Sequence, residues 1–249
     1  MIKENLEIIY NKEIANETFE MELYAPKMAK LAYCGQFINL SLMDEGKLLK
    51  RPISICQIKD ESLIITYKIN GFGTKQLSTY TSGLILEAIG PLGNGFNLVE
   101  NNSCLLVGGG IGIPPLLELA RNLKEKNNKL NIILALRNKD YLIYYDEFKE
   151  LGNVYVCTDD GSMEYHGNAI SFLNENDISF DYIYSCGPEI LLKLLEEKYQ
   201  GRKGYLSYEA RMACGVGLCH GCVKGEKHYC VCTDGPVFPL GVIYDEFKR

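Results

Sequence analysis

The amino-acid sequence predicts an antiparallel β barrel, then an α/β domain with a parallel sheet, then a short cysteine-rich segment. Short apolar runs broken by Gly and Pro fill the first part of the 249 residues, whereas strand and helix patterns alternate in the middle part. Five of the ten cysteines follow, all between residues 214 and 232. We therefore expect domains at 1–97 and 98–206 and a small C-terminal segment at 207–249.

Composition excludes several classes of partner. The chain has 26 basic and 32 acidic side chains, a net charge of −6, and no basic tract, so we expect no nucleic acid or anionic membrane as a partner. The start of the chain, MIKENLEIIYNKE, lacks the apolar core of a signal peptide, and no apolar run reaches the roughly 18 residues of a membrane span. We expect a soluble, cytoplasmic protein whose cysteines are not paired as disulfides.

The first part predicts the strands of a small barrel or sandwich. The runs are LEIIY, TFEMELYA, QFINLSL, SLIITYKI and GLILEAIG, and GTKQLSTYT could form one short helix. Two motifs interrupt these runs: KRPISI, which we interpret as a Pro-fixed turn, and YKINGFGT. Arg51 and Lys68 beside a Gly-Thr turn suit a pyrophosphate, and the Ser54 hydroxyl could bond to a flavin ring. The alternative is a solvated Arg and Lys bordering a strand.

The middle part predicts βαβ units. Apolar strands at 103–109, 129–137, 153–158 and 181–188 alternate with helix patterns at 114–127, 144–151 and 189–199. This alternation is typical of a parallel sheet, whose strands end at a common edge where ligands bind.

The loop after the strand at 103–109 has features of a phosphate-binding turn. In LLVGGGIGIPP, Gly110 and Gly112 permit close approach of an anion to the amides at the start of a helix. Pro115 replaces the third glycine of the dinucleotide fingerprint, and Arg137 and Asn138 stand where a ribose-binding acid is usual. An ordinary strand–helix corner is therefore the alternative.

Two further loops favour the ligand site over the corner. SCGPE at 185–189 and TDDGS at 158–162 also end predicted strands of the same parallel sheet. Three loops at one edge predict a crevice that holds a nucleotide.

The cysteine-rich segment predicts a metal centre. The order Cys214-x4-Cys219-x2-Cys222, with a fourth thiol farther on, is the plant-type [2Fe–2S] pattern. A zinc site usually offers two separated pairs instead, although His220 or His228 could complete one. Unliganded thiols are the third possibility.

Two cysteines compete for the fourth position of this centre. Cys232 lies in VCTDGPVF, where the Gly-Pro step and the apolar pair after it would anchor a returning strand. We therefore prefer Cys232, with Cys230 as the alternative.

Taken in order, RPIS, GFGT, GGGIGIPP, TDDGS and CGPE resemble motifs of the ferredoxin–NADP reductase superfamily. The tail, EARMACGVGLCHGC followed by VCTDGPVF, resembles the family of dihydroorotate dehydrogenase B electron-transfer subunits, which carry FAD and a [2Fe–2S] cluster. The resemblance covers nearly the whole chain, and the tail is its most specific part.

The resemblance implies a flavin-binding barrel, a Rossmann-like nicotinamide domain and a small [2Fe–2S] segment. The residues expected to bind FAD or NAD are Arg51, Pro52, Ile53, Ser54, Thr66, Tyr67, Lys68, Gly73, Thr74, Gly109, Gly110, Gly112, Cys186, Gly187 and Pro188. The expected cluster ligands are Cys214, Cys219, Cys222 and Cys232. Ser54 near flavin N5 and Cys186 near the nicotinamide are the candidate catalytic residues.

The function that the resemblance implies is electron transfer in pyrimidine biosynthesis. Electrons from dihydroorotate would reduce FMN in a separate catalytic subunit and then cross the cluster and FAD to NAD+, in an assembly expected to be α2β2. Flavin must stand between the other two groups because it exchanges electrons singly or in pairs. The preference for NAD rests on the resemblance. One alternative is a subunit of an NADH-dependent ferredoxin:NADP or sulfide oxidoreductase, and another is a zinc-stapled binding module without a redox role.

Overall fold

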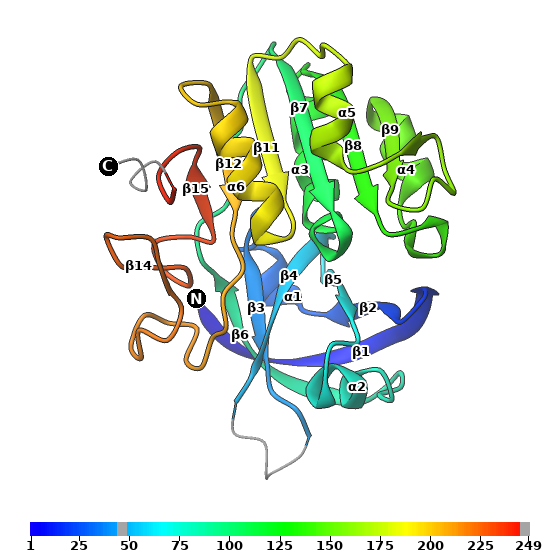
Figure 1. Ribbon diagram of the computed structural model, residues 1–249. Coiled ribbons are helices and arrows are strands. Elements are labelled where there is room, and N and C mark those ends of the chain that lie inside the picture. The colour runs from blue at the N-terminus through cyan, green and yellow to red at the C-terminus, as the bar shows by residue number, and fades with distance from the viewer. Residues whose placement is uncertain (44–48, 245–249) are drawn as a thin grey trace.

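The computed structural model describes residues 1–43 and 49–244. Figure 1 shows a barrel at the bottom, a layered α/β unit above it, and the orange and red C-terminal segment beside both. The prediction of a barrel followed by a parallel α/β sheet is confirmed.

Six antiparallel strands close the barrel in the order β1-β2-β5-β4-β3-β6. Their bounds are β1 (Ile2–Ala15), β2 (Thr18–Tyr24), β3 (Phe37–Leu40), β4 (Arg51–Ile58), β5 (Ser62–Lys68) and β6 (Ile85–Leu92). Two short helices accompany them, α1 (Pro26–Ala29) and α2 (Phe72–Leu77). Alternation places every second side chain inside, as Leu6 and Ile8 on β1 show.

The motif KRPISI is a strand and not the turn that the sequence suggested. Pro52 is the second residue of β4 and pairs with Asn39 of β3. Proline is tolerated near the start of a strand because a missing N–H there removes little of the ladder. Residues 51–54 are therefore part of the barrel wall, where they pair with residues 37–40 of β3.

The α/β unit is a seven-stranded sheet in the order β10-β9-β8-β7-β11-β12-β15. Its strands are β7 (Ser103–Gly109), β8 (Lys129–Leu136), β9 (Asn153–Thr158), β10 (Tyr165–His166), β11 (Tyr182–Cys186), β12 (Lys203–Ser207) and β15 (Val237–Pro239). The helices are α3 (Pro115–Glu125), α4 (Tyr145–Leu151), α5 (Ala169–Glu175) and α6 (Glu189–Lys198), with single 3₁₀ turns at η1 (Gly110–Gly112) and η2 (Lys139–Tyr141). In Figure 1 the arrowheads of β7, β8 and β11 point toward the barrel, so the ligand-binding edge of the sheet faces it.

A buried polar network joins the barrel to the α/β unit. The Tyr144 hydroxyl, at the start of α4, donates to Glu20 Oε2 of β2 at 2.7 Å and lies 2.6 Å from Thr66 Oγ1 of β5. Burial alone would raise the pKa of Glu20, but hydrogen bonds from Tyr144 and Tyr10 and the charge of Lys12 lower it, so the carboxylate stays charged. The network fixes the orientation of the sheet edge relative to the barrel.

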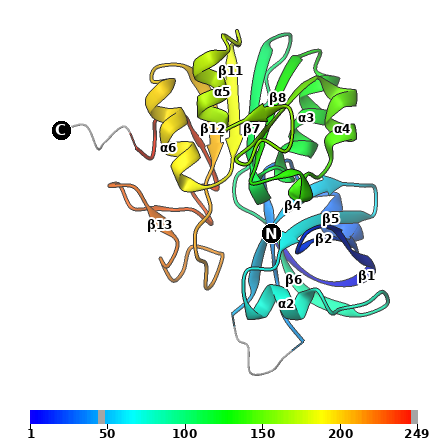
Figure 2. The same ribbon diagram turned by 45° about the vertical axis from the view of Figure 1, so that its right-hand side comes forward.

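The C-terminal segment packs against the barrel and against α6. Its hairpin of β13 (Val223–Lys224) and β14 (Tyr229–Cys230) is followed by β15, which adds to the sheet antiparallel to β12. Phe37 and Leu92 of the barrel share an apolar cluster with Val231 and Phe238 of this segment. Figure 2 shows the segment below α6 and beside the barrel. Among residues 1–43 and 49–244, no helix is long and apolar enough to cross a membrane.

Candidate functional site

The glycine turn and the Cys186 turn pack directly on each other. Strands β7 and β11 are parallel neighbours, with Cys186 opposite Gly108. A Cβ on Gly112 would lie 2.4 Å from the carbonyl carbon and oxygen of Cys186. A Cβ on Gly187 would lie 3.0 Å from the backbone of Gly109. The structure thus brings together the two loops that the sequence placed at one edge, and glycine is required where their backbones touch.

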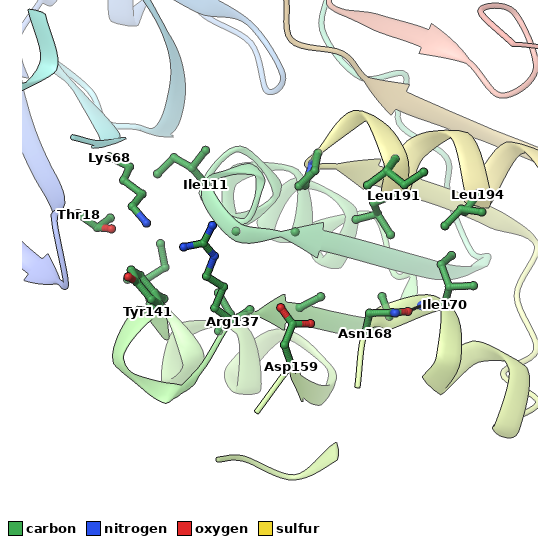
Figure 3. A pocket seen from close by; sticks show the side chains of 18 residues that line it. Thr18, Lys68, Ile111, Arg137, Tyr141, Asp159, Asn168, Ile170, Leu191 and Leu194 are labelled. Atoms are coloured by element: carbon green, nitrogen blue, oxygen red, sulfur yellow. Dashed lines mark hydrogen bonds between the residues drawn. The ribbon is translucent and has the colours of Figure 1, made fainter. Parts of the chain in front are cut away.

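A cavity of about 460 Å³ opens at this edge of the sheet. Figure 3 shows its lining, which runs from Thr18 and Lys68 of the barrel to Leu191 and Leu194 of α6. Gly109, Gly110 and Pro188 of the predicted nucleotide site are also part of its wall. A mostly apolar cleft with few polar groups at the carboxyl ends of parallel strands is a typical nucleotide site.

Two charged side chains of opposite sign enter this cavity from neighbouring strands. Arg137 follows β8, and Asp159 follows β9. In Figure 3 the guanidinium of Arg137 points toward Ile111 and Lys68, while the Asp159 carboxylate points into the cavity between Arg137 and Asn168. The cationic end of the cavity is therefore nearest the barrel, and the carboxylate lies farther out.

Cys186 lies at the end of β11 and is 2% exposed. Burial, with the nearby Glu209 carboxylate, raises the pKa of its thiol to about 12, so the side chain is neutral near pH 7. Glu209 lies two residues after β12. Surrounding protein raises the pKa of its carboxyl, and Lys224 opposes that shift. The Cys186 side chain can therefore contact a nucleotide as a small neutral thiol, but it cannot act as a thiolate nucleophile.

The barrel brings Arg51 and Gly73 together. A Cβ on Gly73, in α2, would lie 1.9 Å from Arg51 Nε, so the guanidinium stacks on bare backbone. Arg51 Nη1 also donates to the Leu49 carbonyl at 2.6 Å. Thr74 Oγ1 accepts the Asn70 amide at 2.8 Å, which holds the turn before α2. Arg51 on this short turn is part of the arrangement predicted for a pyrophosphate. Lys68, the other cation of that prediction, lies over the Tyr141 ring and lines the cavity at the sheet edge instead.

The other predicted flavin residues divide into two groups. Ser54 is partly exposed on β4 and pairs with Phe37, whereas Thr66 is buried against Tyr144. Tyr67 is 2% exposed and points into the barrel core, where its hydroxyl donates to Asn11 Oδ1 at 2.9 Å. The side chains of Thr66 and Tyr67 already have protein partners, so any contact with a flavin would use their backbone.

The cysteine loop presents its four expected ligands as two pairs. The Cys214 and Cys219 thiols are in hydrogen-bonding contact, and the Cys222 thiol contacts Cys232 and also Cys230. Among residues 1–43 and 49–244, no three metal-binding side chains converge on a single point. Two pairs are the arrangement that a two-iron centre requires, because each iron takes two thiolates in addition to the bridging sulfides.

Backbone amides point at these sulfurs. The Cys214 Sγ accepts the N–H groups of Val216 and Cys219 at 3.4 Å each, and the Cys232 Sγ accepts the Gly217 amide at 3.2 Å. Burial opposes ionisation of Cys214, but these amides lower the pKa of its thiol to about 7. A loop of inward amides stabilises negative sulfur, so these residues fit an iron–sulfur cluster.

Cys230 has a different environment from Cys232. Its Sγ lies 3.6 Å from His220 Nδ1, and its own amide donates to Asp234 Oδ2 at 2.7 Å. Burial and Cys222 raise the pKa of both thiols, that of Cys232 to about 12, and the Asp234 charge adds to the shift at Cys230. The Gly217 amide bonds to Cys232 instead, which favours Cys232 as the fourth ligand.

Sequence reasoning missed four polar residues at these sites. Asp159 was visible in TDDGS, whereas Glu209 follows β12, a strand that was not predicted from the sequence. Lys224 pairs with Glu189 Oε2 at 2.8 Å, which fastens the cysteine hairpin to the first residue of α6. Asn39 gave no signal in the sequence, because its partner is Cys214, 175 residues away.

The fold and the site define an oxidoreductase of the ferredoxin–NADP reductase type: an antiparallel barrel faces a glycine-lined nucleotide crevice. Residues 209–243 match the family model described as the iron–sulfur cluster binding domain of dihydroorotate dehydrogenase B. Proteins of Bacillus cereus and Bacillus anthracis named dihydroorotate dehydrogenase B (NAD(+)), electron transfer subunit, are each 40% identical over 98% of this chain and 99% of their own length. The chain belongs to this family of electron transfer subunits.

Solved structures share the fold of this chain. A structure of an NADH-dependent reduced ferredoxin–NADP oxidoreductase is 32% identical, with a TM-score of 0.87 over 97% of this chain and 90% of that chain. The FAD/NAD-binding domain of a nitric oxide dioxygenase from Vibrio cholerae is 18% identical, with a TM-score of 0.69 over 82% of this chain and 97% of that chain. The second likeness shows the fold alone.

Proposed function

We propose that this chain carries electrons from dihydroorotate oxidation in a partner subunit through a [2Fe–2S] cluster and FAD to NAD+. The partner is a catalytic subunit that holds FMN, and the assembly is α2β2. The bound groups supply the redox chemistry, since flavin exchanges electrons singly with a cluster and in pairs with a nicotinamide. The chain's own residues bind these groups and set their spacing.

One observation carries the proposal. The two thiol pairs lie in a segment that packs on β3 and β6, next to β4, while the nucleotide edge of the sheet faces the barrel. One barrel therefore borders both sites. A flavin held by Arg51, Ser54 and Gly73 would lie within reach of the cysteine loop and the Cys186 turn, as electron transfer in two directions requires.

Co-expression tests the proposal. With an FMN-containing dihydroorotate dehydrogenase subunit from the same source, we expect a complex that reduces NAD+ when dihydroorotate is added. The chain alone should oxidise NADH with an artificial dye but should not oxidise dihydroorotate. A complex that forms yet leaves NAD+ unreduced would contradict the proposal.

A second candidate function has its own support. The solved structure at 32% identity is named as an NADH-dependent reduced ferredoxin–NADP oxidoreductase. In that case the chain would accompany a larger flavoprotein instead of a dihydroorotate-oxidising subunit. The protein that co-purifies with this chain separates the two candidates.

Asp159 is expected to set the preference for NADH over NADPH. A 2′-phosphate near its carboxylate meets a like charge, whereas a ribose 2′-hydroxyl can donate to it. We expect Asp159→Asn to reduce the ratio of kcat/KM for NADH to that for NADPH by about tenfold, since one charge–charge contact at a cleft mouth is worth on the order of 1–2 kcal/mol.

Asp160→Asn provides the matched control for this test. The Asp160 carboxylate accepts the Ser162 amide at 2.9 Å within its own turn and is not part of the cavity lining. Its replacement should leave the ratio unchanged. An equal change in both variants, or none in Asp159→Asn, would contradict the role of Asp159.

A further inference from the structure

Asn39 lies in the middle of β3, where the barrel meets the cysteine loop. It is 1% exposed, and its strand partners are Pro52 of β4 and Ile89 of β6. Its Nδ2 donates to the Cys214 carbonyl oxygen at 3.3 Å. One buried side chain therefore stands between the strand expected to hold the flavin and the first expected ligand of the cluster.

The cysteine loop is shaped around this amide. Gly215 follows Cys214 with a φ of +70°, and a Cβ there would lie 2.7 Å from Asn39 Nδ2. Both the left-handed backbone and the lack of room require glycine at this position. The loop therefore packs its backbone directly on the Asn39 side chain.

The other end of the amide is unsatisfied within the protein. Asn39 Oδ1 is buried and accepts no hydrogen bond from any residue in 1–43 or 49–244. A buried acceptor without a partner costs about 1–3 kcal/mol, and the other residues of β3 are all apolar. The orientation of the amide follows from its partner, because the Cys214 carbonyl can only accept. An asparagine kept for stability alone would not be left in this state.

We propose that Asn39 is a positioning residue that fixes the Cys214 end of the cluster loop against the flavin strand and raises the reduction potential of the cluster. The inference rests on the proposed function. The donated N–H withdraws negative charge from the Cys214 peptide, in addition to the amides of Val216 and Cys219 that bond to the Cys214 sulfur. Donors around the ligands stabilise the reduced, more negative state of an iron–sulfur centre.

The test compares Asn39→Leu with Asn94→Leu. Leucine has nearly the shape of asparagine but no donor. Asn94 Nδ2 donates to the Asp234 carbonyl at 2.8 Å, so it also ties the barrel to the cysteine segment by a side chain–carbonyl bond, but away from Cys214. Both variants and the wild type are purified with flavin and cluster bound. Their iron content is measured, and the midpoint potential of the cluster is read by EPR during a redox titration.

We expect the cluster of Asn39→Leu to titrate at a more negative potential than that of the wild type, with iron content and the rate of flavin reduction by NADH unchanged. Asn94→Leu should match the wild type in all three. Should Asn39→Leu not fold, Asn39→Ser is too short to reach the Cys214 carbonyl and carries the same expectation. Equal potentials in the wild type and the Asn39 variant, or equal shifts in both variants, would overturn the role of Asn39. A wild type without iron would overturn the proposed function itself.

Discussion

Replacing any one of the four expected ligands by alanine is expected to remove the cluster and stop electron transfer to the partner. The ligands are Cys214, Cys219, Cys222 and Cys232. Each belongs to a thiol pair, so one loss leaves an iron with an incomplete coordination shell. We expect dihydroorotate-driven NAD+ reduction to fall at least ~100-fold, more than is typical when only an outer-shell partner of a ligand is lost. NADH oxidation by an artificial dye should persist, because it needs only the flavin and the nucleotide crevice.

Cys230→Ala is the control for this series. Its sulfur faces His220, and its surroundings lack the inward amide that Cys232 receives from Gly217. The variant should keep its iron and its EPR signal. Loss of the cluster in Cys230→Ala together with its retention in Cys232→Ala would show that the fourth ligand was assigned to the wrong residue.

Gly112→Ala is expected to have the next largest effect. The new Cβ would lie 2.4 Å from the Cys186 backbone, so either the glycine turn or the Cys186 turn must move. Overpacking of this kind costs about 1–3 kcal/mol of unfolding free energy. Because a displacement of about 1 Å can cost about 100-fold in rate, we expect flavin reduction by NADH to slow by up to that factor. Stopped-flow absorbance at the flavin band measures it.

Two comparisons isolate the nicotinamide site in this experiment. Reduction of the flavin in Gly112→Ala by dithionite should remain complete, since it does not use the crevice. Gly201→Asn places a side chain in a turn with a φ of +77° and no atom within 4 Å, so it should behave as the wild type. Unchanged NADH kinetics in Gly112→Ala would mean that the two turns do not form the nicotinamide site.

Local sequence patterns were sufficient to predict that a barrel is followed by a parallel α/β sheet and then by a cysteine-rich segment. Apolar runs, alternating helices and the glycine turn each depend on residues close together in the chain, and the structure has strands and helices at most of the expected places. KRPISI was misread as a turn because proline is rare in strands, and only the register with β3 reveals why it is tolerated there. The helix α5 and the strand β12 were also not predicted, because both are short and their apolar pattern is weak.

Parts of the site depend on contacts that no local pattern encodes. Strand β15 completes the sheet by pairing with β12 across the whole cysteine segment. Asn39 meets Cys214, and Tyr144 reaches Glu20 from 124 residues away. The sequence predicted which thiols belong to the cluster loop, whereas their division into two pairs follows from how the loop folds on the barrel.

The absorption spectrum of the purified chain, taken before and after NADH is added, tests most directly whether cysteine-bound iron communicates with a flavin. We predict flavin bands with a broad iron–sulfur shoulder that bleach together on addition of NADH, with an EPR signal of the reduced two-iron centre appearing at the same time. A colourless protein that contains zinc, or a flavin that bleaches while the iron stays oxidised, would contradict the account.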